Sequence, residues 1–203
     1  MNKLEYFKTA VWTESKIEFL KSLNKASDPY IKDAIKKDKN TFGISHHSTT
    51  LLNDTKFKDF HDYVGQKCWE YLDTQGFDMS QYELFFQESW VQQFSKKGGG
   101  HHSAKVNWNT HVNALYFLKC SSDSSYPIFH DPRVGSRATK LRMKQDNILY
   151  NEVELINFKP KPGDLIIFPG YLEHEFSLDK SKKDFRYIHT CMTGILKTMA
   201  KEG

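Results

Sequence analysis

The spacing of apolar positions changes from a helical period to a strand period after about residue 80. Before that point, apolar residues recur every three or four positions, which predicts helices over 17–23, 30–35 and 53–73. Asp28-Pro29 predicts a separate start for the second helix, because Asp caps helices and Pro suits their first position. A short strand is expected before them, from Leu4 to Trp12.

The second part of the chain reads as a series of strands. Tyr82–Phe94 alternates apolar and polar residues over its whole length, as a long strand with one buried face does. Shorter strands are expected at Val112–Lys119, Pro127–Phe129, Val153–Phe158, Leu165–Phe168 and Phe185–Met192. Many short strands after a helical start predict a β-sandwich or jelly roll with helices laid on one sheet. We therefore expect a mainly β, α+β fold in one domain over residues 1–203, with helical residues 1–80 packed on a core of residues 81–203.

Composition narrows the class of protein without naming a function. The chain of 203 residues is long enough to bury a proper core, and its net charge of +4 is too weak to imply nucleic acid or a membrane surface. Three cysteines lie far apart in the sequence, which favours reduced thiols over a disulfide framework. No apolar run approaches the roughly 18 residues that span a membrane, and no signal peptide is recognisable. These features predict a soluble, cytoplasmic protein; its oligomeric state stays open.

The stretch with the clearest chemistry lies near the end of the chain. The buried strand Leu165–Phe168 is broken by Pro169-Gly170, and His174 follows. A short polar connection then leads to a second strand that begins at Phe185-Arg186, and such a connection suits an antiparallel pair. A neutral imidazole suits a metal ion and an arginine fork suits a carboxylate. We expect His174 and Arg186 to point into one cavity.

This arrangement resembles the distal half of the active site in the 2-oxoglutarate/Fe(II)-dependent oxygenases, in particular a group common in phage and bacterial genomes. The chain has Phe168-Pro169 followed by His174, then the strand Arg186–Thr190, and earlier His130-Asp131-Pro132-Arg133. The likeness reaches the N-terminal part through 7–12 and 48–52, so that it covers nearly the whole chain.

The resemblance implies a double-stranded β-helix that holds Fe(II) and takes 2-oxoglutarate as a co-substrate to hydroxylate a further substrate. It makes His174 the third iron ligand and Arg186 the anchor of the far carboxylate of 2-oxoglutarate. Thr190 shares the strand parity of Arg186, so its hydroxyl could add a hydrogen bond, and Phe117 would line the interior beside the co-substrate. Peptidyl proline, a nucleobase, a small metabolite and a sugar are all open as substrates.

The two proximal iron ligands are where this chain departs from the family. They normally come from H-x-D or H-x-H, but counting back from Tyr116-Phe117-Leu118 leads to Lys105 and Asn107. A lysine about 4 Å from a dication would be repelled by on the order of 8 kcal/mol at an effective dielectric of about 20. Asn107 could serve as a weak ligand. His111 at the start of the next strand could compensate, because it shares the parity of Asn113, Leu115 and Phe117, which are expected to face the interior. His101 or His102 could also do so if the glycine-rich loop folds back.

The departure leaves three functions to weigh. The first is a 2-oxoglutarate- and Fe(II)-dependent oxygenase. The second is a degenerate jelly-roll member without productive iron that acts as a binding module. The third is a sugar-binding, cupin-like domain whose aromatic residues stack on its ligand.

Several other polar segments are better explained by structure than by chemistry. His46-His47 face opposite ways in a strand and cannot easily share a metal. His130-Asp131 is expected to be structural, and Lys36–Lys39 to be a solvated helix end. The glycine-rich loop 96–100 is either a lid over a pocket or a surface turn.

Overall fold

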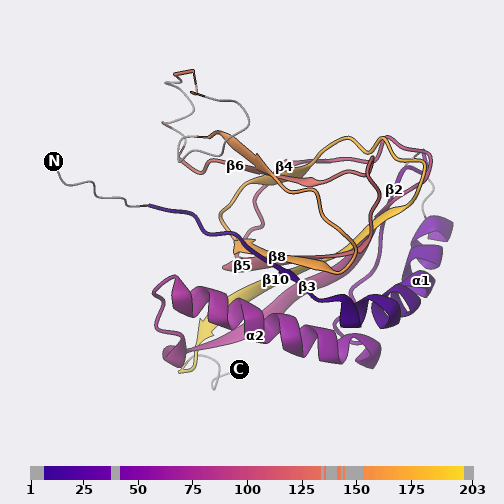
Figure 1. Cartoon of the computed structure of the whole chain (residues 1–203). Coiled ribbons are helices and arrows are strands. Elements are labelled where there is room, and N and C mark those ends of the chain that lie inside the picture. Colours follow the sequence, from indigo (N-terminus) through magenta and orange to yellow (C-terminus); the bar gives the residue numbers. More distant parts are fainter. Residues whose placement is uncertain are drawn as a thin grey trace.

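Two facing antiparallel sheets form the body of the molecule (Figure 1). The computed structural model describes residues 7–37, 42–133, 135, 141, 142, 144 and 153–198. Its strands are β1 (Trp12–Ser15), β2 (Ser45–His47), β3 (Tyr82–Phe94), β4 (His102–Lys105), β5 (Val112–Lys119), β6 (Pro127–His130), β7 (Leu155–Asn157), β8 (Asp164–Pro169), β9 (His174–Phe176) and β10 (Phe185–Leu196). The larger sheet has the order β1-β8-β5-β10-β3-β2, and the smaller one β4-β9-β6-β7.

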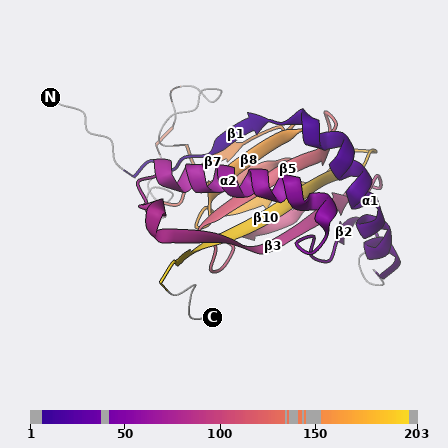
Figure 2. The ribbon, with the colours of Figure 1, turned by 90° about the horizontal axis from the view of Figure 1, so that it is seen from below.

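Two helices cover the outer face of the larger sheet, as the view from below shows (Figure 2). They are α1 (Leu20–Lys37) and α2 (Lys58–Thr74), and three short 3-10 turns accompany them at Ile17–Phe19, Thr55–Phe57 and Met79–Gln81. Among the described residues, no helix combines the length and the apolar character that a membrane crossing requires. The predicted mainly β, α+β fold class is confirmed.

The long, alternating strands were predicted well and the short elements poorly. The expected bounds of Tyr82–Phe94 and Val112–Lys119 are those observed. The strands β2, β4 and β9 were not predicted, because three or four residues are too few to display a period. The first strand begins at Trp12, where the predicted one ends, and residues 4–6 of that prediction lie outside the described part of the chain.

The predicted helix start at Asp28-Pro29 is wrong, because α1 runs through it without a break. Asp28 does not serve as a cap; its carboxylate accepts a hydrogen bond of 2.6 Å from Arg186 Nη1 in the sheet. Pro29 lies in the helix interior, where it lacks an N–H to donate. The hydrogen bond between Asp28 and Arg186 offsets part of the stability lost with that backbone hydrogen bond.

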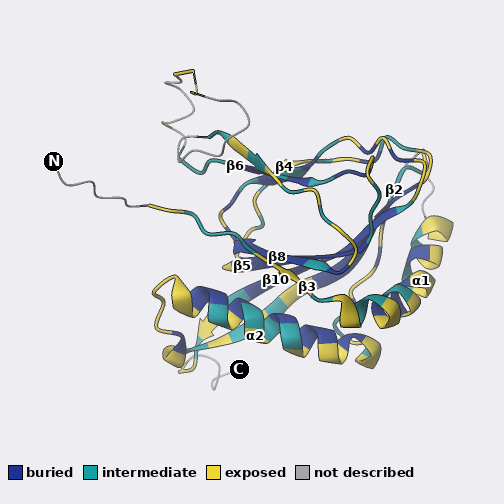
Figure 3. Cartoon of the chain, viewed as in Figure 1, coloured by how far each residue is buried: buried dark blue, intermediate teal, exposed yellow. Residues whose placement is uncertain are grey.

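Alternation along β10 divides the buried residues into two cores. Ile188 and Met192 face the helices and pack with residues of α1 and α2, whereas Phe185 and Tyr187 face the space between the sheets. Figure 3 shows the sheet strands as the most buried elements and the helices as buried on one side only. The space between the sheets is therefore a packed core lined largely by aromatic residues, not an empty barrel.

Gly170 marks a close approach that no other residue would permit. It follows β8, and its N–H donates a hydrogen bond of 2.8 Å to the carbonyl of His111. A Cβ at this position would lie 1.8 Å from the carbonyl oxygen of Thr110, which is a backbone atom and cannot rotate away.

We expect Gly170→Ala to lower the free energy of unfolding by at least about 2–3 kcal/mol, since the backbone of one segment must move. The matched control is Gly65→Ala in α2, where a Cβ would make ordinary contacts of 3.5 Å or more with Phe86. That change should be neutral or stabilising by about 0.5–1 kcal/mol, because Ala favours the helix. Urea unfolding of both variants tests this; equal midpoints would contradict it.

Candidate functional site

Buried polar side chains from β4, β9 and β10 meet between the two sheets. Lys105 and His174 are directly opposite each other in the β4–β9 pairing, so their side chains leave the same face. His189 on β10 lies beside them, with its ring centroid 5.7 Å from that of His174. Asn107, just after β4, donates through Nδ2 to His189 Nε2 at 3.3 Å and to Asn113 Oδ1 at 2.9 Å.

The His174 side chain has the properties of a metal ligand, because one of its ring nitrogens has no partner. Its Nδ1 donates a hydrogen bond of 3.0 Å to the carbonyl of Leu172, which leaves Nε2 as the unprotonated nitrogen. That Nε2 is buried and has no hydrogen-bond partner among the described residues. Burial lowers the pKa of His174 to about 4, so the ring is neutral near pH 7. A fixed tautomer with a free lone pair suits a metal ligand.

The remaining side chains do not complete a centre for Fe(II). Such a centre takes two histidines and a carboxylate on one face of the ion. Within the described ranges, no three His, Cys, Asp or Glu side chains are grouped so as to hold a metal ion. Lys105 faces His174, and Asn107 engages its neighbours through its amide nitrogen. Beside His174 these two side chains offer an amine and an amide, so this donor set does not fit iron.

Arg186 does not share a cavity with His174, so that expectation is wrong. Its side chain is buried on the helix side of β10, where Nε donates to Gln93 Oε1 at 2.7 Å and Nη1 to Ser27 Oγ at 2.9 Å and Asp28 Oδ1 at 2.6 Å. The hydrogen bond from Arg186 lowers the pKa of the Asp28 carboxyl. Strand parity is the physical reason: positions 186, 188 and 190 face the helices, and 185, 187 and 189 face the interior.

Thr190 follows Arg186 to the helix side, so it too lies away from His174. Its hydroxyl is 3.4 Å from Ser89 Oγ, which is hydrogen-bonded at 2.9 Å to His61 Nε2 from α2. Burial lowers the pKa of His61 to about 4. These three groups satisfy one another beneath α2 and form a structural contact between helix and sheet.

Phe117 does face the interior, as expected, but among rings that leave little room for a polar co-substrate. Its ring centroid lies 6.0 Å from that of Phe185 and 6.1 Å from that of Tyr187. Tyr187 in turn stacks on Phe176 at 4.4 Å. Aromatic side chains thus occupy the end of the interior toward which Arg186 was expected to point.

His111 is not in the interior, contrary to expectation. The side chain is exposed, and its Nδ1 accepts a hydrogen bond of 3.0 Å from the backbone N–H of Gly194. Parity did place Asn113 and Leu115 correctly, but His111 precedes the first paired residue of β5 and turns outward. It cannot replace a proximal ligand at His174.

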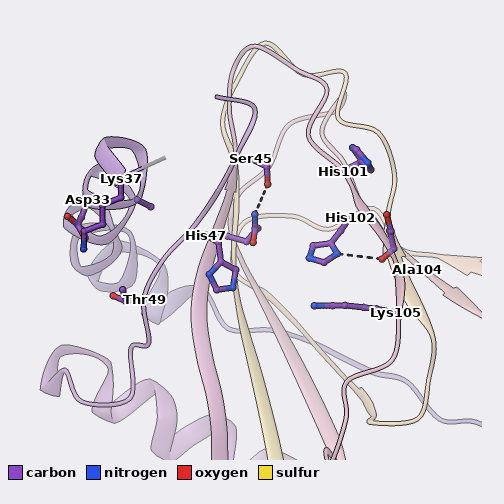
Figure 4. Close-up of a pocket in the computed structure, with 12 residues that line it drawn as sticks. Asp33, Lys37, Ser45, His47, Thr49, His101, His102, Ala104 and Lys105 are labelled. Carbon is purple, nitrogen blue, oxygen red and sulfur yellow. Dashed lines mark hydrogen bonds and ion pairs between the residues drawn. The ribbon is translucent and has the colours of Figure 1, made fainter. Parts of the chain in front are cut away.

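A cleft opens beside the polar cluster, between β2 and β3 on one side and β4 on the other (Figure 4). Its volume is about 670 Å³. His47 points into it from β2, and His102 and Lys105 extend toward His47 from β4. The ring of His47 stacks on Trp90 at 5.1 Å, and Lys105 Nζ lies 5.4 Å from the centroid of the same Trp90 ring. His46, the sequence neighbour of His47, is buried and does not line the cleft.

Three other segments named in the sequence analysis can also be located. The glycine-rich loop is pinned to its neighbour, since Gly99 N donates to Asp179 O at 2.8 Å and Asp179 N to Gly100 O at 2.7 Å. These two hydrogen bonds favour the surface-turn interpretation of this loop and not the mobile-lid interpretation.

His130 lies 3.8 Å from Glu173 and 3.8 Å from Glu175, and Asp131 pairs with Arg133 at 2.9 Å. Of the Lys36–Lys39 segment, Lys36 and Lys37 end α1, and the other two lie outside the described residues.

Sequence reasoning missed the part that His189 and Trp90 play in this site. Each stands on a strand among apolar residues. The available signal was a polar or large side chain at a strand position whose alternation predicts burial. This signal was overlooked at His189. Arg186 was expected in the interior, and that expectation placed every odd-numbered residue of the strand on the wrong face.

Comparison with known proteins places this architecture in a family context. The family model described as "Putative 2OG-Fe(II) oxygenase" matches residues 88–187. No curated protein matches the chain by sequence. A prolyl-4-hydroxylase from Pseudomonas putida superposes with a TM-score of 0.60 at 10% identity, covering 91% of this chain and 92% of that one. AviO1 from Streptomyces viridochromogenes Tue57 gives 0.64 at 10% identity, with 91% and 90% covered.

A third similar structure is the epimerase SnoN in complex with Fe3+, alpha ketoglutarate and nogalamycin RO. It superposes with a TM-score of 0.61 at 9% identity, covering 91% of this chain and 79% of that one. Likeness at such low identity shows the fold, so the predicted jelly roll is confirmed, and it carries no residue of those sites over to this chain.

The Arg186–Asp28 contact predicts an energetic coupling between β10 and α1. Arg186→Met and Asp28→Asn should each lower the free energy of unfolding, and their double-mutant cycle should give a coupling of about 1–2 kcal/mol. The carboxylate is half exposed, which keeps the value below that of a fully buried pair. Urea denaturation measures it; additive effects would contradict a structural role for Arg186.

The buried histidines predict that stability falls on acidification. The folded-state pKa of His61 lies below the unfolded value of about 6.5, so its contribution is complete above pH 6.5 and is lost as the pH falls toward 4. A shift of this size corresponds to about 3 kcal/mol.

Urea titrations at pH 6.5 and pH 4 measure this loss. Between these two pH values, the free energy of unfolding should fall by about 2–3 kcal/mol less in His61→Gln than in the wild type. The control His101→Gln changes an exposed loop residue and should follow the wild type. Parallel profiles for all three proteins would show that His61 is already protonated in the fold.

Proposed function

We propose that this chain, which belongs to the superfamily of 2-oxoglutarate/Fe(II)-dependent oxygenases, uses the shared fold to bind a small-molecule ligand without a productive iron centre. The observation that carries the proposal is the pairing of Lys105 with His174 across β4 and β9. We take Lys105 and Asn107 to occupy the positions of the two proximal ligands in the family. An ammonium group there opposes a dication, and an amide adds no charge to offset it.

Two further observations support a binding role. Arg186, the candidate anchor for a co-substrate carboxylate, is committed to α1 on the far face of the sheet. Phe176, Phe185 and Tyr187 fill the interior near its position on the strand. A co-substrate held as the family implies would have to displace these rings.

An active oxygenase is the second candidate. The match to the family model and the unpaired Nε2 of His174 favour it. The family implies a small-molecule co-substrate and a hydroxylase-type reaction, for which this chain would offer His174 as one ligand. The two candidates differ in a property that can be measured directly, namely the affinity for Fe(II) in the presence of 2-oxoglutarate.

Anaerobic titration with Fe(II) and 2-oxoglutarate distinguishes them. We expect the wild type to show no visible charge-transfer band at stoichiometric metal, because the donor set is incomplete. Lys105→His combined with Asn107→Asp should create the band and raise Fe(II) affinity by about tenfold or more, since it supplies an imidazole and a carboxylate beside His174.

The triple variant that adds His174→Ala is the matched control, and it should lose the gained affinity while keeping the same two new donors. A stoichiometric band in the wild type would overturn the proposal in favour of the oxygenase. A folded double variant without any gain in affinity would show that the proximal positions lie elsewhere.

A further inference from the structure

Lys105 is a half-buried cation for which the described residues provide no counter-ion. Its ammonium group lies over the face of Trp90, with 5.4 Å from Nζ to the ring centroid. No carboxylate in the described ranges lies within ion-pair distance of Nζ, although the exposed Glu88 is near enough to influence it. Removing an ammonium group from water without a partner is costly, and an anion beside it would offset that cost.

Among the residues that line the cleft around Lys105, none offers a free carboxylate. The acid among its lining residues, Asp33, is already paired with Lys37 at 2.7 Å. The imidazoles of His47 and His102 reach the same space from opposite walls (Figure 4). At about 670 Å³ the cleft has the size of a small-molecule site.

The wall behind the cleft also holds unsatisfied polar atoms. His174 Nε2 and Trp90 Nε1 are buried without a hydrogen-bond partner in the described part of the chain. Both residues belong to the set that surrounds Lys105: His174 pairs with it across the strands, and Trp90 lies beneath its ammonium group. Buried polar groups are normally satisfied. The Trp90 N–H is a donor that an anion can satisfy, whereas the unprotonated His174 Nε2 is an acceptor and needs a donor group on the ligand.

We propose that this cleft binds a small organic or inorganic anion, with its carboxylate or phosphate group held by the Lys105 ammonium. The indole N–H of Trp90, which has no partner among the described residues, is a further donor close to this ammonium group. The Nδ1 atoms of His47 and His102 face backbone carbonyls, so their neutral rings present Nε2 as an acceptor for a hydroxyl group of the ligand. This inference rests on the proposed binding function and adds the chemical class of the ligand to it.

The test is an NMR titration that follows the indole N–H of Trp90, assigned by comparison with Trp90→Phe. One arm uses inorganic phosphate and the other uses succinate, at constant ionic strength in buffer freed of metal ions. We expect a saturable shift with a Kd below about 1 mM in at least one arm. Saturation by phosphate alone identifies a phosphate site, and saturation by succinate alone a carboxylate site.

Two lysine variants supply the controls. Lys105→Met keeps the aliphatic stem and removes the charge, and it should weaken binding by at least about tenfold. Lys21→Met makes the same change at an exposed position near the start of α1 and should bind like the wild type. Lys105→Arg keeps a cation and should retain binding, which separates a loss of charge from a loss of fold.

Wild-type affinity in Lys105→Met, or no saturable shift in either arm, would overturn the inference. These titrations contain no iron, so their outcome is independent of the Fe(II) titration. A protein that binds iron yet shows Lys105-dependent anion binding would refute only the proposed function, and one that binds neither would refute only the anion site.

Discussion

The alternation of side chains along β10 is the constraint on which the arrangement of this molecule depends. The strand lies in the middle of the larger sheet, paired with β3 on one side and β5 on the other. Every second side chain therefore enters one of two separate cores. Arg186, Ile188 and Thr190 serve the helix layer, and Tyr187 and His189 serve the space between the sheets. A shift by one residue would exchange these roles completely.

That constraint decides where the residues of the resembling motif lie in space. An arginine in the expected motif is present, but its guanidinium reaches α1, where Asp28 and Ser27 receive it. The opposite face of the strand carries aromatic rings that pack against Phe117 and Phe176. The scaffold is shared with the superfamily, while the polar groups of its interior are arranged differently.

Electrostatics give the polar cluster its character. Burial lowers the pKa of His174 and that of His189, so both rings are neutral near pH 7. Lys105, by contrast, brings a basic group to the mouth of the same cluster, and burial lowers its pKa as well. Because no carboxylate of the described residues is paired with Lys105, we infer that its amine makes the site favour anions over metal cations, while the neutral imidazoles add no charge.

The sequence by itself determined the fold class, the long strands Tyr82–Phe94 and Val112–Lys119, and the helix that became α2. These features follow from periodicity, which is a local property repeated over enough residues to be read. It also singled out His174 and Lys105, because their residue types stand out against a known motif. The substrate class could not be read in the same way, since it depends on which side chains from distant segments meet.

Tertiary structure alone decided which face each polar residue occupies and what it contacts. Arg186 turned to the helices because the neighbouring Phe185 and Tyr187 gain more from the interior core, a choice that only the packing of two sheets can make. The strands β2, β4 and β9 exist because neighbouring strands pair with them, and they bring His47, Lys105 and His174 together. Long-range pairing is not encoded in three residues, and for that reason the cleft beside Lys105 appears only in the folded chain.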